Sequence, residues 1–115
     1  MNWNRIYQFF DDPPPKYLPK ELAVAYVLSL LLEGETAGVE MIERLEQQGS
    51  PYRISEHILR IALDFLLAEN AITRRWDSSH GRGRPRRLYC LTATGIPLAQ
   101  DLAQRWRQYG RESGH

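Results

Sequence analysis

The 115-residue sequence contains a single cysteine, Cys90. One cysteine cannot form an internal disulfide or supply the repeated thiols of a zinc finger, so neither device holds the fold together. No apolar run approaches the roughly 18 residues that a membrane-spanning helix needs. The N-terminus also lacks the charged and then apolar stretches of a signal peptide. These absences predict one cytoplasmic domain that has no membrane contact, metal or cofactor.

The motifs of the common enzyme classes are also missing. The three histidines, His57, His80 and His115, are scattered along the chain. Cys90 lies in a predicted strand with no evident base or orienting acid, so a nucleophilic mechanism is not indicated. No glycine-rich phosphate-binding motif is present. We therefore expect no catalytic residues.

Charge is nearly balanced overall but is unevenly distributed. The net charge is +1, yet residues 21–70 hold nine acids and three bases, whereas residues 71–115 hold nine bases and three acids. Such segregation favours a basic face that binds a polyanion.

The densest basic stretch, residues 74–87, holds six arginines and one acid. Residues 72–76 and 86–91 have the character of two strands, and the glycine-containing loop between them predicts a β-hairpin. Pro85 presets the start of the second strand. Arginines on such a hairpin suit phosphates and base edges, although a solvated basic loop is the alternative.

Three helices are predicted before the hairpin. The first begins at Pro19 and ends near Glu33, with Gly34 as a left-handed stop. The second has Thr36 as its N-cap and ends at Gly49; after an extended connector, the third runs from Ser55 to Asn70. The third helix is expected to face the core with Ile58, Ile61, Ala62, Phe65 and Leu66, and to face outward with Glu56, His57, Arg60 and Asp64.

A fourth helix is predicted from Thr92 or Thr94 to about Tyr109. Its apolar stripe follows a small core that is already closed, so we expect a second copy of the chain to cover it. The alternative is packing on its own domain. The expected dimer interface comprises Leu98, Leu102, Trp106 and Tyr109.

The first residues are unusually aromatic, with Trp3, Tyr7, Phe9 and Phe10 followed by Pro13-Pro14-Pro15, a stiff extended spacer. We expect this arm to pack on its own domain or on a partner subunit, with a disordered tail as the alternative.

The order helix, helix, short strand, helix, hairpin predicts a mainly helical α+β fold, the winged helix-turn-helix. The expected divisions are an arm (1–18), a winged-helix domain (19–92), a dimerisation helix (93–110) and a tail (111–115). In this fold the third helix enters the major groove and the hairpin, or wing, contacts the backbone or minor groove. The predicted DNA contacts are Tyr52, Arg53, Ser55, His57, Arg60, Arg74, Arg82, Arg84, Arg86 and Arg87. Glu56 and Asp64 oppose phosphate binding, which shifts weight from the helix to the wing.

The segment Gly83-Arg84-Pro85-Arg86-Arg87-Leu88-Tyr89-Cys90-Leu91-Thr92, through Gly95, resembles the wing signature of the PadR-type transcriptional regulators. The Leu28–Leu31 stretch with Gly34 and Gly38 is similar to the family's first two helices. The sequence departs from the family pattern at Val39 and at Glu56-His57-Ile58.

The resemblance implies a sequence-specific regulator of double-stranded DNA. The Leu18–Leu22 stretch is similar to a small circadian-clock member of the family. That likeness implies a homodimeric repressor acting on the promoter of the clock gene kaiA, at a pseudo-palindromic operator.

Two other functions stay open. One is a winged-helix protein–protein interaction module without specific DNA binding. The other is a ligand-responsive regulator whose pocket is lined by Tyr26 and Trp106, although nothing in the sequence demands an effector.

Overall fold

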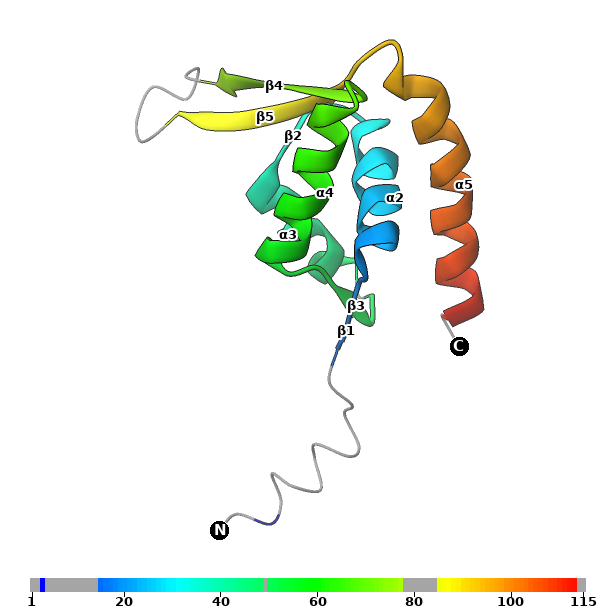
Figure 1. Ribbon diagram of the computed structural model, residues 1–115. Coiled ribbons are helices and arrows are strands. Elements are labelled where there is room, and N and C mark those ends of the chain that lie inside the picture. Colours follow the sequence, from blue (N-terminus) through cyan, green and yellow to red (C-terminus); the bar gives the residue numbers. More distant parts are fainter. Residues whose placement is uncertain (1–2, 4–14, 49, 78–84, 114–115) are drawn as a thin grey trace.

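The computed structural model describes residues 3, 15–48, 50–77 and 85–113. Helices α2 (Lys20–Leu31), α3 (Gly38–Gln47) and α4 (Glu56–Ala68) precede a hairpin of β4 (Ile72–Asp77) and β5 (Arg86–Leu91), and α5 (Gly95–Ser113) follows it. Three strands of two residues complete the fold: β1 (Lys16–Tyr17), β2 (Thr36–Ala37) and β3 (Tyr52–Arg53). This order confirms the predicted winged helix-turn-helix, shown in Figure 1.

Helix α2 is the centre of the core. It lies between α4 and α5 (Figure 1) and packs against both. A helix with apolar side chains nearly all round is stable only when several sides are covered, as the sequence predicted. Its buried residues are Ala23, Ala25, Tyr26, Val27, Leu28, Leu30 and Leu31.

The start of α3 differs from the prediction. Thr36 is not its N-cap but belongs to β2, where it pairs with Tyr89, and its hydroxyl donates to the Gly34 carbonyl at 3.1 Å. Ala37 occupies the N-cap position without a side-chain hydrogen bond. The predicted Thr36 cap was wrong because β2 adds a third strand to the hairpin. Capping motifs depend on neighbouring residues, so they do not reveal a pairing with a distant strand. Gly34 has the expected positive φ, +147°.

Helix α4 has the expected ends. The Ser55 hydroxyl accepts a hydrogen bond from the Ile58 amide at 3.1 Å, and Asn70 adopts a left-handed φ of 58°. Its buried face is rotated from the predicted one, however. Ile61 and Phe65 are 37% and 52% exposed. The residues that are buried are Leu59, Ala62, Leu63 and Leu66. Apolar residues occur on both stripes of this helix, so the periodicity alone could not choose between them.

The hairpin is the core of a three-stranded antiparallel sheet in the order β2-β5-β4. Ile72 opposes Leu91 at its base, and Asp77 opposes Arg86 at its far end. A separate parallel pair joins β1 to β3, with the Lys16 amide donating to the Pro51 carbonyl at 3.0 Å and the Leu18 amide to the Arg53 carbonyl at 2.9 Å. Leu18, which follows β1, is buried.

A tight junction links α4, the hairpin and α5. The Thr92 amide donates to the Ala71 carbonyl at 3.0 Å, and the Thr92 hydroxyl donates to the Asn70 carbonyl at 2.7 Å. The same hydroxyl accepts from the Gly95 amide at 3.0 Å, so Thr92 holds the first turn of α5. A Cβ on Gly95 would overlap the Ala71 carbonyl group, which explains why glycine stands there.

Helix α5 packs on its own domain. Trp106 lies 5.3 Å from the Tyr26 ring and Tyr109 lies 5.1 Å from the Tyr52 ring, between centroids. Leu102 also packs against the core, whereas Leu98 is 42% exposed. We expected that no other part of the chain could cover the apolar stripe of this helix. That expectation was wrong, because one side of α2 packs against α5. The helix also continues to Ser113, beyond the predicted end at Tyr109.

Gly95→Ala should lower the free energy of unfolding by about 1–3 kcal/mol, because the backbone must move to admit the methyl group. Gly38→Ala is the matched control, since a Cβ there meets only the Leu59 Cδ2 at 3.9 Å and Gly38 is also the first residue of a helix. Urea unfolding of both variants measures the difference. Equal stabilities would show that the Ala71–Gly95 contact is not tight.

Tyr26 gives the stability a pH dependence in the alkaline range. Its hydroxyl donates to the Met41 carbonyl at 2.5 Å. Burial raises the pKa of Tyr26 from 10.0 to about 12. The unfolded chain therefore loses this proton first, so the Tyr26 contribution is complete below pH 10 and disappears as the pH rises to about 12.

Urea unfolding between pH 9 and pH 12 tests this dependence when wild type is compared with Tyr26→Phe. The difference in free energy of unfolding should be greatest at the lower end of this range and should shrink above pH 10, the ordinary tyrosine pKa. A difference that does not change with pH would contradict the raised pKa.

Candidate nucleic-acid interface

A groove of about 380 Å³ lies between the start of α3, the outer face of α4 and the wing. Arg60 comes from α4, Arg74 from β4 and Arg87 from β5, so three elements each supply a guanidinium to its border. Glu56 and Asp64 of α4 also line it, as do Gly38, Val39, Ile42, Leu59, Leu63 and Tyr89. The groove is therefore a charged cleft in which arginines from helix and wing converge.

Strand alternation decides which wing arginines face this groove. Successive side chains of a strand point to opposite faces of the sheet, so Arg74 and Trp76 share one face of β4. Arg87 lies opposite Trp76 in β5, and its guanidinium sits 4.7 Å from the centre of the Trp76 ring. This cation–π contact orients Arg87, whose guanidinium makes no ion pair within the part of the chain that the structure describes. Its N–H groups are of the kind that bind phosphate.

The other face of the wing uses its arginines internally. Arg75 forms a bidentate pair with Glu35, with donor–acceptor distances of 2.8 and 3.2 Å. The hydrogen bonds that Arg75 donates to Glu35 raise the pKa of Arg75 still further, so this guanidinium stays charged. Arg86 donates to Glu40 of α3 at 2.5 Å and lies 3.7 Å from Asp77. Both side chains fasten the wing to the body of the domain.

The N-terminal end of α4 presents fewer free groups than the sequence suggested. Ser55 caps the helix, and Arg53 donates to the Ser50 and Tyr52 carbonyls at 2.7 and 2.8 Å. Arg53 also lies 4.0 Å from Glu46. His57 and Arg60, by contrast, are exposed.

Tyr52 does not fit the DNA contact predicted for it. Its side chain is only 4% exposed and stacks against Tyr109. The hydrogen bond with Tyr52 also raises the pKa of Tyr109. Tyr52 therefore anchors α5 to β3 instead of facing a duplex.

The structure thus brings Arg60, Arg74 and Arg87 together, with His57 exposed nearby on α4, and assigns Arg53, Ser55 and Arg86 to contacts within the domain. Arg82 and Arg84 lie outside the described residues. Sequence reasoning missed Trp76, which is 61% exposed on the wing. The alternation of side chains along β4 could have indicated it, because this alternation places Trp76 on the same face as Arg74.

The pocket considered for an effector differs from the one that the described residues form. Tyr26 and Trp106 contact each other in a tilted ring pair and do not line a pocket together. A hollow of about 350 Å³ does lie between α2 and α5, but other residues line it: Glu21, Leu22, Ala25, Leu102, Arg105, Gln108 and Tyr109. Within the described ranges, no group of three or more histidine, cysteine, aspartate or glutamate side chains could hold a metal ion. None of the helices described is long and apolar enough to cross a bilayer.

The comparison with protein families identifies this architecture. Residues 27–101 match the model of the transcriptional regulator PadR-like family. The chain belongs to this family. The match begins in the second half of α2 and covers α3, α4, the hairpin and the start of α5. It therefore includes α3, α4, β4 and β5, the elements that border the groove.

Among solved structures, this PadR-like chain is similar to the circadian clock associated protein Pex from Anabaena, with 43% identity, a TM-score of 0.89 and complete coverage of both chains. Pex from Synechococcus is 47% identical with a TM-score of 0.83, over 95% of this chain and 97% of that one. Bacillus subtilis PadR, solved in complex with operator DNA, is 24% identical with a TM-score of 0.63, over 73% of this chain and 46% of that one. The last likeness establishes the shared fold. No curated protein sequence matches the chain.

Arg87→Ala should weaken binding to any DNA duplex and lower the salt dependence of the binding constant, because the substitution removes a guanidinium that we expect to contact phosphate. Arg75→Ala is the matched control: it removes an arginine from the opposite wing face, where Glu35 already neutralises it. Fluorescence anisotropy with a labelled duplex measures both variants. If the two substitutions weaken binding equally, the groove face is not the face that meets DNA.

Proposed function

We propose that this protein is a cytoplasmic, sequence-specific regulator that binds double-stranded DNA, with α4 in the major groove and the wing on the adjacent backbone or minor groove. The observation that supports it is the convergence of Arg60, Arg74 and Arg87 on one groove. Arginine can form two hydrogen bonds to the acceptors of guanine, and it binds phosphate in the same bidentate way. One set of side chains can therefore position the protein on the DNA backbone and also read the base sequence.

The acidic residues of α4 would make the interface select among base pairs, in addition to the attraction that the arginines exert on phosphate. Glu56 and Asp64 border the same groove as the arginines and would repel a phosphate brought close to them. A carboxylate can instead accept a hydrogen bond from the amino group of cytosine. Positions contacted by Glu56 should therefore favour C·G pairs, while the wing supplies affinity that does not depend on sequence.

The protein is further proposed to act as a homodimeric repressor on a pseudo-palindromic operator. Two α4 helices related by a two-fold axis would then enter successive major grooves, about 34 Å apart. Leu98, which is 42% exposed on α5, is available for a contact between copies. The likeness to Pex, a circadian clock associated protein, supports a clock-gene target, and we propose the kaiA promoter.

The deciding experiment is a titration of a duplex from the candidate promoter and of a scrambled duplex, each at two salt concentrations. If each subunit neutralises three to four phosphates, log K should fall with log salt with a slope of about −6 for the dimer, and the promoter should be preferred. Salt-steep binding that favours the promoter supports a sequence-reading regulator. Weak, equal binding to both duplexes would contradict it and would favour a protein–protein interaction module.

A further inference from the structure

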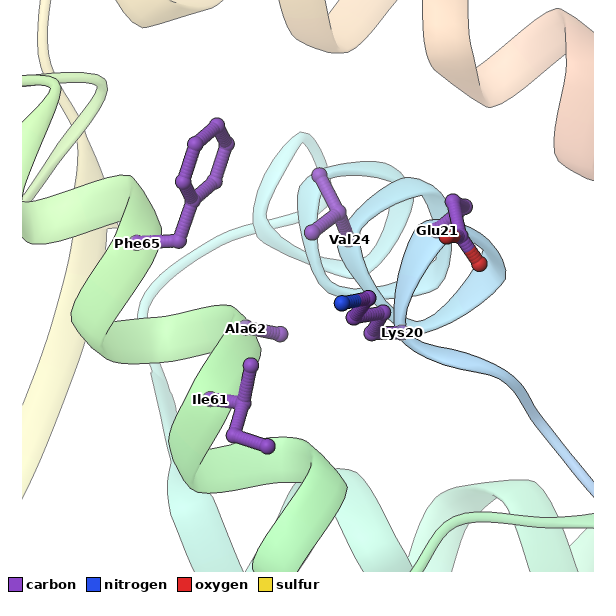
Figure 2. A pocket seen from close by; sticks show the side chains of 6 residues that line it. All are labelled: Lys20, Glu21, Val24, Ile61, Ala62 and Phe65. Atoms are coloured by element: carbon purple, nitrogen blue, oxygen red, sulfur yellow. The ribbon is translucent and has the colours of Figure 1, made fainter.

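A second groove, of about 490 Å³, runs between α2 and α4 and is separate from the DNA groove. Figure 2 shows that side chains from both helices border it, with Lys20 and Glu21 on the first turn of α2. Its apolar lining consists of Val24, Ile61, Ala62 and Phe65. Ile61 and Phe65 are the two large apolar residues of α4 that the core leaves exposed, at 37% and 52%.

This groove has the features of a protein-binding surface. Neighbouring large apolar side chains that remain exposed, bordered by charged residues, mark interaction sites rather than ordinary surface. An apolar channel between two helices suits an amphipathic helix, which enters with side chains spaced i, i+3, i+4 and i+7.

The N-terminal region of the chain contains a segment with this spacing. Trp3, Ile6, Tyr7 and Phe10 stand at i, i+3, i+4 and i+7, and the intervening positions hold Asn4, Arg5, Gln8 and Phe9. We name residues 3–10 the aromatic segment. Trp3 is helical and 64% exposed, so the single chain leaves its indole without cover.

The connection between the segment and the domain points to a groove on another copy. The chain that leads to α2 is fixed at Lys16 and Tyr17, which pair with β3, and at the buried Leu18. The sequence Pro13-Pro14-Pro15 directly before this strand favours an extended spacer, at about 3.1 Å per residue. A return of residues 3–10 to their own groove, which begins at Lys20, would require the chain to reverse where three prolines resist it.

We propose that the aromatic segment of one copy docks as a helix in the α2–α4 groove of a second copy, so that two chains exchange their N-terminal arms. Trp3, Ile6, Tyr7 and Phe10 would cover Val24, Ile61 and Phe65. Arg5, on the polar side of the segment, is complementary to Glu21 at the rim. The inference rests on the proposed homodimer and is independent of DNA binding.

The test begins with sedimentation velocity of the full-length protein over a concentration series. Phe65→Glu should raise the dimer dissociation constant at least tenfold, and Trp3→Ala with Phe10→Ala should do the same. Combining all three changes should add less than threefold, because both sets remove one shared contact. Val39→Glu is the matched control, since Val39 is 58% exposed but lies outside this groove. Circular dichroism verifies that each variant folds.

Crosslinking then distinguishes exchange from docking within one chain. In a Cys90→Ser background, one protein carries Gln8→Cys and a second, tagged protein carries Lys20→Cys. A short bis-maleimide should join the tagged to the untagged chain in the mixture. A chain carrying both cysteines that crosslinks only internally would show that the segment docks on its own domain, and this would overturn the exchange.

The remaining outcomes separate this inference from the homodimer itself. A wild-type dimer whose dissociation constant is unchanged by Phe65→Glu overturns the docking and leaves the homodimer standing. Equal effects of Phe65→Glu and Val39→Glu also overturn it, because the groove would then have no special role. A wild type that stays monomeric at every concentration overturns both.

Discussion

The close contact between Ala71 and Gly95 governs how the helices of this protein are arranged. The Ala71 carbonyl accepts hydrogen bonds from the amide and the hydroxyl of Thr92, at 3.0 and 3.1 Å, and leaves no room for a Cβ on Gly95. The end of α4, the base of the hairpin and the start of α5 are thereby held next to one another in space. Since α5 is fixed at its first turn, the rest of the helix packs along α2, where Trp106 contacts Tyr26.

The sheet sorts the basic residues of the wing by function. Alternation places Arg75 and Arg86 against acids of the domain, whereas Arg74 and Arg87 face the groove beside α4. Ion pairs with Glu35 and Glu40 contribute little individually, because they are at least partly exposed. Their contribution is geometric, because they hold the wing against the domain and so set the distance between Arg60 and the wing arginines that line the groove.

The sequence predicted the elements well because their signals are local. Ser55 and Asn70 mark the ends of α4 through a hydroxyl and a left-handed φ, and the family signature lies in one continuous stretch. The failures depend on contacts between distant residues. Thr36 joins a strand because Tyr89 is its neighbour, and Tyr52 is buried because Tyr109 covers it. A list of basic residues likewise cannot separate Arg86 from Arg87, since only the fold brings Glu40 to the first and Trp76 to the second.

The short parallel pair of β1 and β3 has a mechanical consequence. Leu18 is hydrogen-bonded to the Arg53 carbonyl, two residues before the Ser55 that caps α4. A pull on the N-terminal end of the chain would load these parallel strands in shear, and β3 would carry part of the force to the start of α4, while the chain itself carries the rest to α2. The end of the molecule that is farthest from the wing in sequence is thus mechanically connected to the helix that we propose for the major groove.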